Sequence, residues 1–98
     1  MTLPSRLSVI NQLETLRKLV EAGTATAASF QQVRNVIIDF HATEEGGTRL
    51  VTWVLVDIEN AEFYYCRAAD YTQPTRRQFA LGEIDEAIGF SRQLEETA

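Results

Sequence analysis

The apolar residues near the start of the chain recur every three or four positions. From residue 5 to residue 22 they are Leu7, Ile10, Leu13, Leu16, Leu19 and Val20. This spacing places them on one stripe of an α-helix, with charged residues outside it. Pro4 and Ser5 are typical residues at a helix start, and Gly23 is typical after a helix end. The pattern therefore predicts an amphipathic helix over residues 5–22.

The middle of the chain is rich in β-branched and aromatic residues. The segments "VIIDFHAT" and "RLVTWVLVDI" flank Glu44–Gly47, a suitable four-residue hairpin loop. Pairing the segments across this loop places Ile38 opposite Trp53, within a row of apolar pairs. A second hairpin that turns at Asn60–Ala61 places Leu55 opposite Cys66. The segment "RRQFALG" then provides a possible fourth strand.

A helix is the alternative for the first of these segments. On a helix over residues 26–41, one face would carry Phe30, Val33, Ile37, Phe40 and His41. We favour the strand because the two halves of the hairpin match when they are paired.

The end of the chain predicts a second amphipathic helix, from Glu83 to about Glu96. Its inner stripe is Ile84, Ala87, Ile88 and Leu94, and acidic residues in its first turn suit the helix dipole. The predicted fold is therefore a single α+β domain over residues 1–98. It consists of an N-terminal helix, an antiparallel three- to four-stranded β-meander and a C-terminal helix.

The predicted sheet is apolar on both faces. On its second face, Ile37 would lie opposite Val54 and Val56 opposite Tyr65, with few polar residues beside them. Such a face needs cover, which a helix or a second copy of the chain would provide. We therefore expect a homodimer that forms through the second sheet face.

The charge and composition exclude several classes of function. A net charge of −5 argues against a nucleic-acid binder. The carboxylates bunch at residues 44–45, 57–62 and 83–86, which either keeps the protein soluble or forms an acidic face for a basic partner. One cysteine, no signal-peptide pattern and no apolar run long enough for a bilayer favour a cytoplasmic protein without membrane contact.

The candidate catalytic residues are few. In "DFHATEEGG", Asp39 and His41 are two positions apart and would share one side of a strand. Cys66, which we expect to be a buried structural residue, would lie on the opposite face. Glutamates of a turn beside one histidine are a weak ligand set. We therefore predict no catalytic residue, no metal site and no cofactor.

Two sets of residues are candidates for binding. Tyr71, Arg76 and Arg77 combine an aromatic ring with positive charge in one loop, and with Tyr65 and Phe63 they would contact a protein partner. The alternative is an ordinary loop whose arginines pair with nearby carboxylates. A small-ligand pocket between sheet and helices would instead use Trp53, Tyr64, His41 and Asp39.

The function predicted from the sequence is that of a small acidic regulator, adaptor or inhibitor, which acts by protein contact and not as an enzyme. The alternatives are a small-ligand-binding or minimal catalytic domain, and a structural subunit of a larger assembly.

Overall fold

The protein forms a bundle of four α-helices. The computed structural model describes residues 4–97, with side chains through Leu94. The helices are α1 (Arg6–Ala22), α2 (Ala27–His41), α3 (Arg49–Glu62) and α4 (Gln73–Thr97), and a π-helical segment, η1 (Phe63–Arg67), extends α3.

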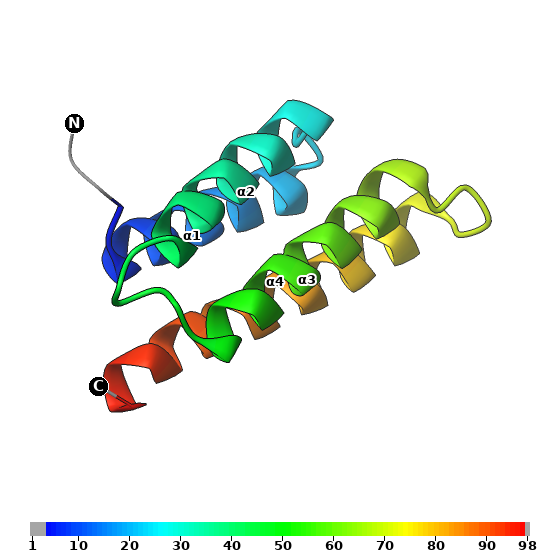
Figure 1. Cartoon of the computed structure of the whole chain (residues 1–98). Helices are drawn as coiled ribbons and strands as arrows, with labels where there is room; N and C mark the ends of the chain where they lie inside the picture. The colour runs from blue at the N-terminus through cyan, green and yellow to red at the C-terminus, as the bar shows by residue number, and fades with distance from the viewer. Residues whose placement is uncertain (1–3, 98) are drawn as a thin grey trace.

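The helices form two antiparallel hairpins that lie against each other, α1 with α2 and α3 with α4 (Figure 1). Each helix packs against the next one in the chain, and α4 also packs against α1, so that the four surround one core. The molecule measures 40 × 27 × 17 Å, and α4 runs along most of its length.

The prediction of helix α1 is confirmed, with its ends in the expected places. Ser5 is the N-cap and forms a capping box with Ser8, and Gly23 ends the helix in the left-handed conformation with φ 76°. The predicted stripe is buried at Ile10, Leu13, Leu16 and Val20, while Leu19 is only partly buried. Val9 is buried, whereas Leu7 is 60% exposed.

The first predicted strand is wrong, because residues 27–41 form helix α2. Thr26 caps this helix in a second capping box, with Ser29. The apolar stripe of the alternative prediction is the one that is buried, and it consists of Phe30, Val33, Ile37 and Phe40.

The rest of the predicted meander is also wrong, since residues 49–62 form helix α3 and the structure has no strand among residues 4–97. Val51, Val54, Ile58 and Ala61 are buried at spacings of three and four. Each β-branched residue costs a helix only a few tenths of a kcal/mol, up to about 0.7, which burial of such a stripe outweighs. Ile38 and Trp53, which the hairpin would have paired, are both exposed.

The proposed dimer interface is lost with the sheet. Because residues 4–97 form no sheet, the argument for a homodimer through a second sheet face no longer holds.

Helix α4 is longer than the sequence suggested. The predicted strand "RRQFALG" is its first part, and the buried stripe Ile84, Ala87, Ile88 and Leu94 is confirmed, with Ala80 one turn earlier. Because the helix begins at Gln73, Glu83 lies in its middle. The predicted interaction of Glu83 with the positive end of the helix dipole therefore does not apply.

No helix among residues 4–97 combines the length and the apolar character that crossing a bilayer requires.

Candidate functional site: the seam between α3 and α4

The segment "DFHATEEGG" contains the last three residues of α2 and the turn that joins α2 to α3. The Thr43 hydroxyl donates a hydrogen bond to the Phe40 carbonyl at 2.6 Å and accepts one from the Gly46 N–H at 3.1 Å. His41 Nδ1 lies 2.7 Å from the Gly46 carbonyl oxygen. A Cβ on Gly46 would lie 2.0 Å from the Phe40 carbonyl oxygen, so only glycine fits there. His41 therefore holds the turn together.

Asp39 does not support His41. On a helix, residues two apart are separated by about 200°, and they do not face each other as they would on a strand. Asp39 is exposed, whereas the second ring nitrogen of His41 faces the Thr52 hydroxyl at 3.4 Å. The prediction that Asp39 and His41 share one side of a strand is therefore wrong.

Cys66 is exposed in η1 and is not the buried residue that the sequence suggested. Partial burial, helped by the Glu62 carboxylate, raises the pKa of its thiol, which disfavours the reactive thiolate. His41 lies beside Thr52 of α3. Thr52 precedes Cys66 by fourteen residues, which corresponds to about 20 Å along α3 and η1. Thiol and imidazole are therefore far apart, although not for the reason that a sheet would have given.

The two arginines of the predicted contact loop face the protein. Arg76 donates hydrogen bonds to the carbonyl oxygens of Tyr64 and Tyr65, at 3.3 and 3.0 Å. These are carbonyls of η1, which Arg76 therefore caps. Arg77 packs over Gly23, where the C-terminal end of the α1 dipole favours a positive charge.

The aromatic residues of the same prediction divide between core and surface. Tyr65 packs on the buried Phe30, with ring centroids 5.8 Å apart. Phe63 and Tyr71 are exposed. They end a continuous row of ring contacts, which runs in the order Phe63, Tyr64, Phe79 and Tyr71 with centroids 5.2 to 5.7 Å apart.

The aromatic row lies at one end of an exposed surface that we call the α3–α4 seam. On α3 and η1 the seam consists of Trp53, Val56, Asp57, Phe63 and Tyr64, and on α4 of Phe79, Glu83, Glu86 and Phe90. At the other end Trp53 packs on Phe90, with centroids 5.4 Å apart, and is still 47% exposed. Beside it is a hollow of about 340 Å³, lined by Trp53, Val56, Asp57, Glu86 and Phe90.

Between the two apolar ends lies a group of three carboxylates that we call the acidic cluster. One oxygen each of Asp57, Glu83 and Glu86 lies within 4.8 Å of the others. Asp57 is only 6% exposed. Its burial, a hydrogen bond with Glu83 and the charges of both glutamates raise its pKa to about 7. Among residues 4–94, whose side chains are described, no lysine or arginine forms an ion pair with the cluster.

The residues predicted for a small-ligand pocket do not meet. Trp53 and Tyr64 both belong to the seam, but they are eleven residues apart, about 16 Å along the helix. His41 and Asp39 belong to α2 and its turn. The sheet that was to form one wall of that pocket is absent.

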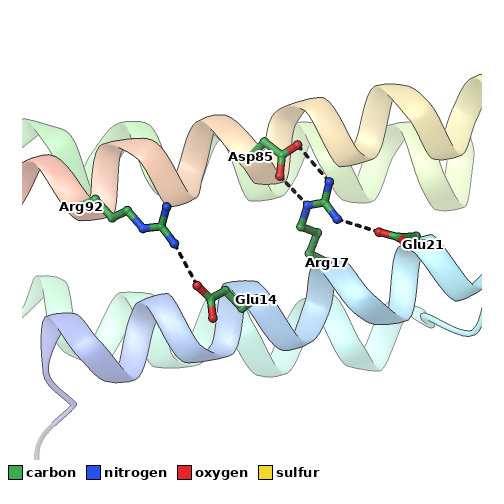
Figure 2. Close-up of polar contacts among 5 residues, drawn as sticks. All are labelled: Glu14, Arg17, Glu21, Asp85 and Arg92. Atoms are coloured by element: carbon green, nitrogen blue, oxygen red, sulfur yellow. Dashed lines mark hydrogen bonds and ion pairs between the residues drawn. The ribbon is translucent and has the colours of Figure 1, made fainter.

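A larger hollow, of about 500 Å³, lies between α1 and α4, but four of its five charged residues pair with one another. Figure 2 shows Arg17 between Asp85 and Glu21, with N–O distances of 2.6 and 2.7 Å, and Arg92 bound to Glu14 at 3.1 Å. The pairs Arg17–Asp85 and Arg92–Glu14 join the two helices, so both arginines are occupied. Among the residues whose side chains are described, 4–94, no lysine or arginine pairs with the acidic cluster, which makes the seam the better candidate site.

The seam has a signal in the sequence that becomes readable once both segments are known to be helical. Trp53, Val56 and Phe63 recur at spacings of three and seven on α3, outside its buried stripe. Phe79, Glu83, Glu86 and Phe90 do so on α4 at spacings of four, three and four.

Comparison with known proteins adds no relative: no family model, curated protein or solved structure matches this chain.

Proposed function

We propose that this protein is a binding module whose α3–α4 seam receives a basic, amphipathic helical segment of a partner protein. The observation that carries the proposal is the order of side chains along the seam. Exposed aromatic rings lie at both ends, and three carboxylates lie between them that form no ion pair with a lysine or arginine within residues 4–94.

The length of the seam suits a short helix. Trp53 and Phe63 are ten residues apart, or about 15 Å, and Phe79 and Phe90 span a similar distance on α4. A partner helix of about three turns covers that length. Its apolar residues, spaced by three and four, would contact the rings, as amphipathic helices do in other grooves.

The charge of the seam determines which helix fits. A lysine or arginine at the centre of the partner would reach Asp57 and Glu86 through the hollow, whose rim includes the rings of Trp53 and Phe90. A cation gains from both the carboxylates and the aromatic faces. An acidic residue at the same place would be repelled, so the acidic cluster sets specificity while the rings supply most of the apolar contact area.

Two synthetic helical peptides of equal length test the proposal. Both carry the same apolar residues, and they differ only in whether the central charged positions are lysine or glutamate. The fluorescence of Trp53, the only tryptophan of the chain, reports binding. We expect the lysine peptide to bind and the glutamate peptide to bind at least tenfold more weakly.

Variants of the protein locate the contact. Trp53→Ala and Glu86→Lys should each weaken the binding of the lysine peptide about tenfold or more, as measured by the fluorescence anisotropy of a labelled peptide. The matched control is Ile38→Ala, because Ile38 is also 47% exposed but lies on α2. Equal affinity for the two peptides, or an equal loss in the Ile38 variant, would refute the seam as the site.

The proposal assigns no reaction to the protein, in agreement with the prediction from the sequence that it is not an enzyme. It also keeps the cytoplasmic location as a prediction, which rests on the single cysteine of the sequence.

A further inference from the structure

The acidic cluster has the geometry of a cation site formed by two facing helices. Glu83 and Glu86 are one turn apart on α4, and Asp57 approaches them from α3. Their nearest carboxylate oxygens all lie within 4.8 Å of one another. Metal sites in helical bundles are commonly built from side chains on facing helices.

A second observation, independent of the clustering, is that Asp57 is buried without a full set of partners. The residue is 6% exposed, and its side-chain Oδ2 is buried and makes no hydrogen bond. A buried carboxylate oxygen without a partner is costly and calls for an explanation, such as an ion that the oxygen binds.

From this arrangement we infer that Asp57, Glu83 and Glu86 form a binding site for one divalent metal ion that prefers oxygen ligands. The ion would lie on the floor of the seam, with Asp57 as its most buried ligand and water completing its coordination. Nothing in the proposed function requires this site.

The ligand set favours Ca²⁺ and Mn²⁺ over zinc or copper. All three ligands are carboxylates, and no cysteine or histidine belongs to the cluster. Oxygens bound to Ca²⁺ at about 2.3–2.6 Å lie up to about 5 Å apart, which the cluster already satisfies. Mg²⁺ prefers bonds of about 2.1 Å in a strict octahedron and would require the side chains to move closer together.

The two cationic ligands proposed for the seam would compete. A metal ion on Asp57 and Glu86 would neutralise the charges that attract a basic partner, so it should weaken the binding of that partner. Only this consequence rests on the proposed function.

Terbium luminescence tests the metal site on the protein by itself. Tb³⁺ resembles Ca²⁺ in size and ligand preference, and it emits when a nearby indole transfers energy to it. Trp53 lines the same hollow as Asp57 and Glu86. We expect a signal that saturates at one Tb³⁺ per chain, is displaced by Ca²⁺ and Mn²⁺, and is displaced at least tenfold less well by Mg²⁺.

Variants separate this site from general attraction to an acidic surface. Asp57→Asn and Glu86→Gln should each lower the affinity of the protein for Tb³⁺ and Ca²⁺ at least tenfold, while circular dichroism shows that the helices remain. The matched control is Glu59→Gln, an exposed carboxylate two residues from Asp57 on the same helix. If Tb³⁺ gives no saturable signal, or if all three variants bind alike, the inference is wrong. Neither result depends on the peptide experiment, which is performed with a chelator present.

Discussion

The substitution Asp57→Asn should stabilise the metal-free protein at neutral and alkaline pH. The side chains have nearly the same shape, so the change removes a buried charge and leaves no cavity. The asparagine amide can also donate a hydrogen bond to Glu83, which Asp57 does only when it is protonated.

The size and pH dependence of this effect follow from the pKa of Asp57, which rises from 3.8 to about 7 on folding. The folded chain holds the proton more tightly than the unfolded chain. The free energy of unfolding therefore falls as pH rises from about 4 to about 7, and it is constant above that range. Three units correspond to about 4 kcal/mol as an upper limit. Because solvent screens the charge of the exposed Glu86, we expect about half, or about 2 kcal/mol.

Urea unfolding followed by circular dichroism, in the presence of a chelator, measures the effect at about pH 4, 6 and 8. The asparagine variant should exceed the wild type by about 2 kcal/mol at pH 8, by less at pH 6 and by almost nothing at pH 4. The control is Asp39→Asn, an exposed carboxylate on α2, whose effect should stay within about 0.5 kcal/mol. A stability difference for Asp57→Asn that does not vary with pH would refute the reasoning.

Two further predictions test the packing that positions the seam. Gly46→Ala should destabilise the protein by about 2–3 kcal/mol in urea unfolding, because the new Cβ would lie 2.0 Å from the Phe40 carbonyl oxygen. Its comparison is Gly82→Ala inside α4, where a new Cβ meets nothing within 4 Å, so this change should stabilise the protein by about 0.5–1 kcal/mol. If Gly82→Ala were the more destabilising of the two, the structure of the turn would be contradicted. Arg76→Ala should speed hydrogen exchange in η1 and lower stability by about 1–3 kcal/mol, because it leaves two carbonyl groups without their donor; unchanged exchange there would show that Arg76 does not cap η1.

The sequence was sufficient to predict the elements whose pattern supports one structure only. In α1, the stripe from Ile10 to Val20 fits a helix and no strand, and the flanking Ser5 and Gly23 mark both ends. Near the end of the chain, Ile84 and Leu94 indicated the helical face correctly, although the start of α4 was missed.

The middle of the chain was mispredicted because two patterns coexist there. Val36, Ile38 and Phe40 alternate as a strand requires, while Val33, Ile37 and Phe40 recur as a helix requires. The intrinsic preferences of these residues for helix or strand differ by only tenths of a kcal/mol per residue, so they do not decide between the two structures. The decision depends on packing against the other helices, where the α2 stripe is fully covered.

The acidic cluster was beyond reach for the same reason. Asp57 and Glu83 are far apart in the sequence, and the predicted fold placed Asp57 on a strand and Glu83 at the start of the C-terminal helix. Only the antiparallel packing of α3 on α4 brings the carboxylates together. Of the predicted contact residues, Phe63 and Tyr71 do lie on the exposed aromatic row, and their role in binding stays a prediction.

The most direct test of the account is an amide and side-chain NMR map of the isotope-labelled protein as the lysine-bearing peptide is added. The account predicts that shift changes concentrate on the seam, at the Trp53 indole and near Glu86 and Phe79, while α1 and α2 stay unchanged. Changes centred on α1 or α2, or none at peptide concentrations well above that of the protein, would contradict it.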